Sequence, residues 1–338
     1  MKLLKQYVCI RIADMTNVDV GLFDFDADST IYGFALNADE HVYLRFGGRD
    51  DESAETYVNE GALKLALERG LDQHKLWQVG KLEKQPRPAA KFPKDFPDIK
   101  RDCIDKNKCV HCHHLGSGKT RQLQGANKLD KQKDLWVYPD IARLGVTLDA
   151  QKGLVVKKVD GAAKSAGMKA KDEIVKVAGR GVLTYGDLQE RLDKMPADTR
   201  TLEVLVKRGD AEETCVVNLP ADWRVTNIER RSYVHALEPF PEFWGRVLDD
   251  AERKRLGVGK DGMACEVTKF WVKTNAQNAG LQVGDIVYEV DGVKDCTFTR
   301  SPTLWIRLNR NAGDTITIKV VRGDKKLEFS FKLKARPW

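Results

Sequence analysis

The stretch that decides the fold occurs twice, as AKSAGMKAKDEI at residues 163–174 and as AQNAGLQVGDIV at residues 276–287. Further along each copy, Lys-Arg-Gly-Asp at residues 207–210 matches Val-Arg-Gly-Asp at residues 321–324, and each is expected to be a turn between two strands. Similar segments in the same order indicate an internal repeat. We therefore predict one small strand-rich domain in two copies, over residues 140–222 and 250–338, with a linker at 223–249.

Each copy is also expected to contain helices. The apolar spacing predicts one over residues 184–194 in the first copy and one over residues 304–309 in the second. The tripeptide Leu-Gly-Val stands at residues 144–146 and again at 256–258. Followed by a strand and the repeated Ala-x-x-Ala-Gly segment, this pattern resembles the PDZ domain in its bacterial form. The resemblance implies two PDZ-type small β-barrels with helices.

The same resemblance implies that C-terminal or extended peptides of partner proteins are the ligands. A PDZ domain adds such a chain as a strand between an exposed strand edge and a helix. We expect the first groove to bind more tightly, because the second is short and charged around residues 258–261. The expected peptide-binding residues are Leu144, Gly145, Val146, Thr147, Leu148, Leu188 and Leu192 in the first copy, and Leu256, Gly257 and Val258 in the second.

Residues 1–78 are predicted to form a mixed α/β unit. Their β-branched content predicts strands over residues 7–12, 30–36 and 41–46, and a helix is expected over residues 53–69. Because no Cys-x-x-Cys lies in this region, we expect no disulfide reductase activity from it.

The stretch from Lys5 to Gly48 looks like the C-terminal half of a thioredoxin fold. Taken whole, the chain resembles the planctomycete-type thioredoxin-like/PDZ domain-containing (seleno)protein family. This resemblance implies an α+β multidomain protein that begins with a partial thioredoxin-like unit. It also implies that the strand and helix carrying the family's redox dithiol or selenocysteine precede Met1 in the complete gene.

Residues 79–139 are predicted to be a Pro-rich basic linker with a Cys/His insert. Residues 81–135 hold 14 Lys/Arg and 7 Asp/Glu, so they account for the net charge of +7 of the whole chain. A nucleic-acid-binding protein would also be expected to carry aromatic side chains on which bases stack, or a recognisable nucleic-acid-binding motif. Neither is visible in this segment. The segment is therefore interpreted as a solvated connector, and no nucleic-acid partner is expected.

The insert contains Cys109-Val110-His111-Cys112-His113, which matches the C-x-x-C-H attachment pattern of c-type haem. In that interpretation both thiols form thioethers and His113 ligates the iron, with Met168, His41 or His235 as the second axial ligand. The alternative is a zinc site that adds Cys103 and His114. A dithiol redox pair is the third interpretation.

Several classes of protein are disfavoured by the sequence. No G-x-S-x-G or H-E-x-x-H motif and no complete phosphate-binding loop is present, so neither a protease nor a nucleotide hydrolase is predicted. No run of 18 apolar residues occurs, which excludes a helical membrane span. The chain as given shows no signal peptide. The location is therefore expected to be the periplasm or cell envelope if the true N-terminus carries a signal, and otherwise the cytoplasm.

Two functions follow from these observations. The first is a tandem-PDZ protein that binds peptides and has a C-x-x-C-H centre serving a redox or envelope assembly. The alternative is a c-type haem electron-transfer or thiol-redox protein, in which the PDZ domains position the partner.

Overall fold

The computed structural model describes residues 2–270 and 274–335 of the chain. The chain forms two compact units, and it passes between them more than once. Unit 1 consists of Met1–Gln122 with Trp136–Thr226, and unit 2 consists of Leu123–Leu135 with Asn227–Trp338. Residues 1–78 and the first repeat are thus parts of one unit, whereas the expected linker 79–139 is divided, with residues 123–135 in unit 2.

The N-terminal part of unit 1 is a hairpin covered by a helix. Strands β1 (Tyr32–Leu36) and β2 (Val42–Gly47) pair in antiparallel fashion, as predicted. Helix α1 spans Glu60–Gln78, later than expected, because the side chain of Asn59 caps it by accepting from the Ala62 amide. The strand expected over residues 7–12 does not form: Val8 and Ile10 lie in an extended segment with 91% and 83% of their surface exposed.

The Cys/His insert has more structure than its composition predicts. Helix α2 spans Pro97–Asp102 and helix α3 spans Cys112–Gly125. The two helices share a small apolar cluster that also takes in residues from the N-terminal segment. Its buried members are Met15, Phe96, Ile99, Cys103, Val110 and Leu115.

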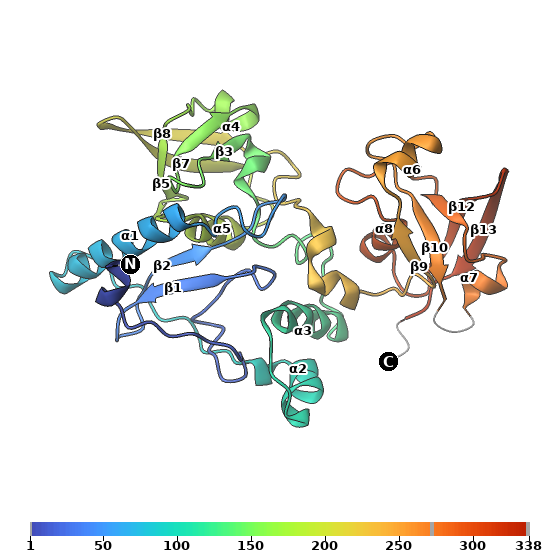
Figure 1. Ribbon diagram of the computed structural model, residues 1–338, viewed down its shortest axis with the longest axis horizontal. Helices are drawn as coiled ribbons and strands as arrows, with labels where there is room; N and C mark the ends of the chain where they lie inside the picture. The colour runs from blue at the N-terminus through green and yellow to red at the C-terminus, as the bar shows by residue number, and fades with distance from the viewer. Residues whose placement is uncertain (1, 271–273, 336–338) are drawn as a thin grey trace. The chain divides into compact units, whose positions relative to one another are not determined.

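The first repeat completes unit 1 (Figure 1). One of its sheets has the strand order β6-β5-β7-β8, and the other consists of β3 and β4. Its helix α5 follows the N-cap Thr184, and its hairpin turns at residues 209–210, both as predicted. The element bounds are β3 (Val146–Leu148), β4 (Val156–Val159), α4 (Gly161–Ser165), β5 (Glu173–Val177), β6 (Arg180–Gly181), α5 (Tyr185–Lys194), β7 (Thr201–Arg208) and β8 (Ala211–Asn218).

The second repeat forms most of unit 2. Its strands make one antiparallel sheet in the order β13-β12-β11-β10-β9. The element bounds are β9 (Trp244–Val247), α6 (Asp250–Arg255), β10 (Cys265–Lys269), α7 (Asn275–Asn278), β11 (Ile286–Val290), α8 (Pro302–Asn309), β12 (Thr315–Arg322) and β13 (Lys325–Lys332).

A buried ion pair recurs at the same place in both repeats. In the first, Arg208 donates from Nε and Nη2 to the carboxylate of Asp172, and Nη2 also reaches the carbonyl of Gly167. In the second, Arg322 donates in the same way to Asp285 and to the carbonyl of Gly280. The sequence repeat is therefore a repeat of structure.

Two expectations about the repeats are corrected by the structure. Neither copy is a closed barrel, because the strands form open sheets of two, four and five strands. The second copy also begins earlier than residue 250, since β9 lies in the range expected to be a linker and pairs with β10.

Candidate functional site

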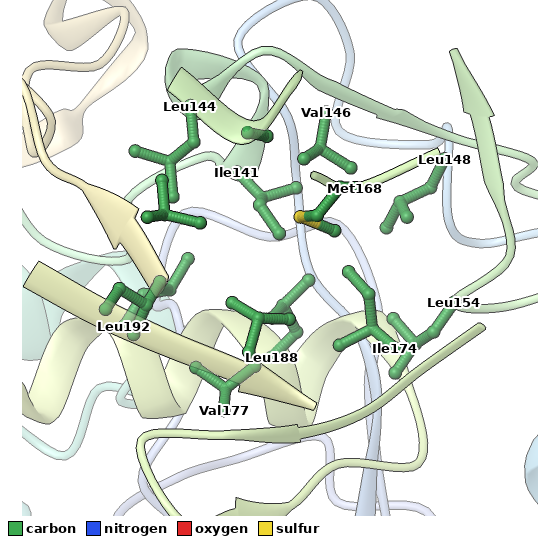
Figure 2. Close-up of a cluster of buried hydrophobic side chains, with 14 of the residues drawn as sticks. Ile141, Leu144, Val146, Leu148, Leu154, Met168, Ile174, Val177, Leu188 and Leu192 are labelled. Carbon is green, nitrogen blue, oxygen red and sulfur yellow. The ribbon is translucent and has the colours of Figure 1, made fainter. Parts of the chain in front are cut away.

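The residues expected to line the first groove form the core of the first repeat instead. Leu144, Val146, Leu148, Leu188 and Leu192 all belong to one cluster of buried side chains. Figure 2 shows the two leucines of α5 pointing toward Leu144 and Val146 across this cluster. Thr147, in contrast, is exposed, and Gly145 is the left-handed residue that ends the turn η4 (Ile141–Leu144) before β3.

The space beside α5 is taken by the chain's own segment 49–57, which runs from the end of β2 toward α1. The side chain of Gln189 on α5 pairs with both backbone groups of Arg49, at 3.1 Å for the amide and 2.7 Å for the carbonyl. Opposite α5, the carboxylate of Asp51 lies 3.1 Å from Nη2 of Arg143. The space beside α5 is therefore occupied by the chain itself, and only residues 53–57 of this segment fall within the range predicted to be helical, 53–69.

The second repeat has its groove at a different place from the one expected. Leu256, Gly257 and Val258 follow helix α6, in the connection between β9 and β10, and not on a strand edge. Strand β9 takes the position that β3 has in the first repeat. Within residues 2–270 and 274–335, β9 pairs with β10 alone, so its other edge faces away from the sheet.

A cavity of about 260 Å³ lies between β9 and helix α8. We call it the β9–α8 groove. Its third side is the chain from Glu229 to Pro241, which precedes β9. The apolar lining residues are Val234, Phe240, Pro241, Phe243, Trp244, Val247 and Leu304, and the polar ones are Glu229, His235, Ser301, Thr303 and Arg307.

Gly245 lets strand β9 lie close to Cys265 of β10 and to Thr303 of α8. A Cβ atom at this position would lie 2.6 Å from Sγ of Cys265 and 3.4 Å from Cγ2 of Thr303 on α8. Trp244 and Val247 are 39% and 36% exposed beside it. The groove thus offers apolar surface beside a strand that, among the described residues, pairs only with β10, which is the combination that an added peptide strand needs.

Charged side chains on β9 and α8 are held by partners in the second repeat. Arg246 forms ion pairs with Glu252 at 2.9 Å and Glu266 at 2.6 Å, and these contacts raise its pKa. Arg307 donates from Nη1 to the carbonyl of Leu237 at 2.6 Å. Sequence reasoning missed this site, although Phe243-Trp244-Gly245 ahead of the acid-rich start of α6 was a visible signal.

The Cys/His insert brings some of its predicted ligands together. Sγ of Cys103 lies 3.5 Å from Nδ1 of His114, which also accepts from the His111 amide at 3.1 Å. The rings of His113 and His114 are 4.4 Å apart. Cys109 is exposed, whereas Cys112 packs against the cluster around Val110, and burial raises the pKa of the Cys103 and Cys112 thiols.

This arrangement does not form a ready metal site. In the part of the chain that the structure describes, no three His, Cys, Asp or Glu side chains are grouped so that they could hold a metal ion. A thioether at Cys112 would require the apolar cluster to open. The haem or zinc centre stays a prediction, and no chemistry is derived through it.

Comparisons with known proteins identify no family. No protein-family model matches the chain, and no curated protein matches it by sequence. Two solved structures of the HtrA-type protease AlgW, with a decapeptide and with a tripeptide, are both 15% identical, with TM-scores of 0.24 and 0.26. They cover 41% and 39% of this chain, which spans 42% and 43% of theirs. An aminopeptidase N family protein from Idiomarina loihiensis is 20% identical over 27% of this chain and 13% of its own, with a TM-score of 0.20.

TM-scores this low do not establish a shared overall fold. Among the described residues, no helix combines the length and the apolar character needed to cross a lipid bilayer.

Proposed function

We propose that the protein binds extended peptides through a PDZ-type groove in its second repeat. The peptide would lie along the outer edge of β9 and place an apolar side chain in the β9–α8 groove. The observation that carries this proposal is the cavity of about 260 Å³ beside an edge strand. A cavity of this size accommodates a leucine or phenylalanine side chain, and its lining is largely aromatic and aliphatic.

A difference between the two repeats supports giving the binding role to the second. In the first, Arg49, Asp51 and Tyr57 contact Gln189, Arg143 and Tyr185, so the chain itself occupies space beside α5. In the second, Trp244 and Val247 are still partly exposed on the groove strand. The first repeat therefore serves to assemble unit 1, and the second repeat is the one that takes a ligand.

Fluorescence anisotropy of the full chain with a labelled peptide tests the proposal. The probe is fluorescein-GSGSVTVL with a free C-terminus, and its amidated form distinguishes recognition of a chain end from recognition of an extended segment. Val247→Lys places a charge on the groove strand at a partly exposed site. We expect at least about a tenfold loss of affinity, equivalent to about 1.4 kcal/mol.

Val216→Lys is the matched control, because Val216 is an exposed valine on β8 of the first repeat. Its affinity for the probe should equal that of the wild type. Equal binding by the Val247 and Val216 variants would place the peptide elsewhere and contradict the proposal, as would a wild-type protein that binds neither peptide form.

A further inference from the structure

The segment 123–135 reaches the β9–α8 groove from a distant part of the sequence. It begins in the last turn of helix α3 and precedes the first repeat, yet it belongs to unit 2. Oε1 of Gln124 accepts from the Glu238 amide at 2.9 Å, and the carbonyl of Leu135 accepts from the hydroxyl of Tyr233 at 2.5 Å. Both contacts are made to the chain that forms the third side of the groove.

Lys131 makes the most concentrated contact of this segment. Its ammonium group donates to the carbonyl of Glu238 at 2.6 Å, to that of Arg307 at 2.7 Å and to that of Arg310 at 2.6 Å. Arg307 lies in the last turn of α8, and Arg310 is its C-cap. Carbonyl groups at a helix C-terminus lack helical partners and carry partial negative charge, so an ammonium group is a fitting donor there.

The three acceptors of Lys131 lie on two different walls of the groove. Glu238 lies between the lining residues His235 and Phe240, whereas Arg307 itself lines the cavity from α8. A second bond, from Nη1 of Arg307 to the carbonyl of Leu237, joins the same two walls. Lys131 therefore lies behind the groove and holds its loop wall against its helix wall.

We infer that Lys131 is a positioning residue of the β9–α8 groove, and that its ammonium group sets the separation of the loop wall from helix α8. The expected effect on peptide binding rests on the proposed function. The structural role of Lys131 does not, because its ammonium group links Glu238 to Arg307, two residues 69 positions apart in the chain. The half-buried ammonium is a compact donor to three acceptors, which neither an apolar nor a planar side chain can reproduce.

The test compares Lys131→Met with Lys133→Met in the full chain. Lys133 is the matched control, because it lies in the same segment but is exposed and pairs with Asp130. With fluorescein-GSGSVTVL as the probe, we expect Lys131→Met to weaken binding by at least about tenfold and Lys133→Met to leave it unchanged. Lys131→Gln, which keeps two amide donors, should fall between them and serves if the methionine variant does not fold.

Hydrogen exchange gives a readout that does not depend on the ligand. In Lys131→Met, peptides covering residues 233–241 and 304–311 should exchange faster, while those from β7 and β8 should not change. Unchanged exchange and unchanged affinity would overturn the inference. If the wild type binds no peptide, the proposed function fails, and the exchange of the two walls alone then decides whether Lys131 positions them.

Discussion

The aromatic ring of Tyr57 lies flat on that of Tyr185, with centroids 3.5 Å apart and planes inclined by 9°. Tyr185 is the first residue of α5, and Tyr57 belongs to the segment between β2 and α1. Both side chains are buried in the core cluster of the first repeat. The hairpin and the first repeat are thus joined by a shared core, which explains why they form one unit.

Removing the Tyr57 ring should destabilise unit 1. Tyr57→Ala deletes a buried aromatic side chain and exposes the face of Tyr185, so we expect the free energy of unfolding to fall by about 3–5 kcal/mol. Tyr57→Phe keeps the stacked ring and should cost far less. Urea denaturation read by hydrogen exchange on peptides from residues 140–222 measures both. Equal effects of the two variants would show that the ring stack does not stabilise the first repeat.

A buried carboxyl should give unit 1 an unusual pH dependence. Burial raises the pKa of Asp187 to about 6, although it accepts from the Arg45 amide and lies 3.9 Å from the Arg45 guanidinium. The folded protein therefore retains this proton up to about pH 6, whereas the unfolded chain releases it near pH 4. The contribution of Asp187 to stability should fall as the pH rises from about 4 to 6, by up to about 3 kcal/mol, and stay constant above that.

Asp187→Asn isolates this effect, since an amide does not titrate. As the pH rises from 4 to 6, the unfolding free energy of the wild type should fall relative to that of the variant. Parallel stability curves for the two proteins across this range would contradict the assignment of the raised pKa to Asp187.

The features that the sequence predicts correctly are those encoded by local pattern and by repetition. The AKSAGMKAKDEI segment and the Arg-Gly-Asp turn occur in both copies, and they predict a repeat of structure. The structure confirms it in the matched ion pairs of Asp172 with Arg208 and of Asp285 with Arg322. The start of the second repeat was misplaced because Leu256–Val258 matches Leu144–Val146 letter for letter. By the register of β9 with β10 and of β3 with β4, its structural counterpart is Pro241-Glu242-Phe243, which shares no residue with it, and helix α6 is inserted between β9 and β10.

Other features depend on contacts that no local pattern records. Val8–Ile12 has the β-branched content of a strand, but a strand also needs a neighbour, and this segment is extended without one among the described residues. Residues 53–57 are expected to begin a helix, yet they belong to the non-helical segment 49–57, which is held by Gln189 and Arg143 from the first repeat. Lys131 likewise acts on residues more than 100 positions away in the chain.

Thiol reactivity should separate the cysteines by burial. Cys9 and Cys109 are exposed, whereas burial raises the pKa of the Cys103, Cys112, Cys215 and Cys296 thiols, and raises that of Cys265 to about 12. Because the thiolate is the reactive form, we expect two fast and five slow thiols with Ellman's reagent at pH 8. Cys109→Ser should remove one fast thiol, and Cys112→Ser none. Protection of Cys109 together with Cys112 would instead favour the predicted haem or zinc centre.

The recurring ion pair gives a matched test of both repeats. Asp285 is fully buried and Asp172 nearly so, and each accepts two bonds from one arginine. Replacing Arg322 by methionine leaves the carboxylate of Asp285 buried without its cation, which should destabilise unit 2. Arg208→Met should have the same effect on unit 1 through Asp172, so hydrogen exchange should locate each loss in its own unit.

A double variant shows whether the loss in the Arg322 variant comes from a buried charge left without its cation. The double variant Arg322→Met with Asp285→Leu removes the charge as well and should recover much of the stability at pH 7. If the double variant is as unstable as the single one, the arginine acts by packing on Phe329, 5.5 Å from the centroid of its ring, and not by neutralising Asp285.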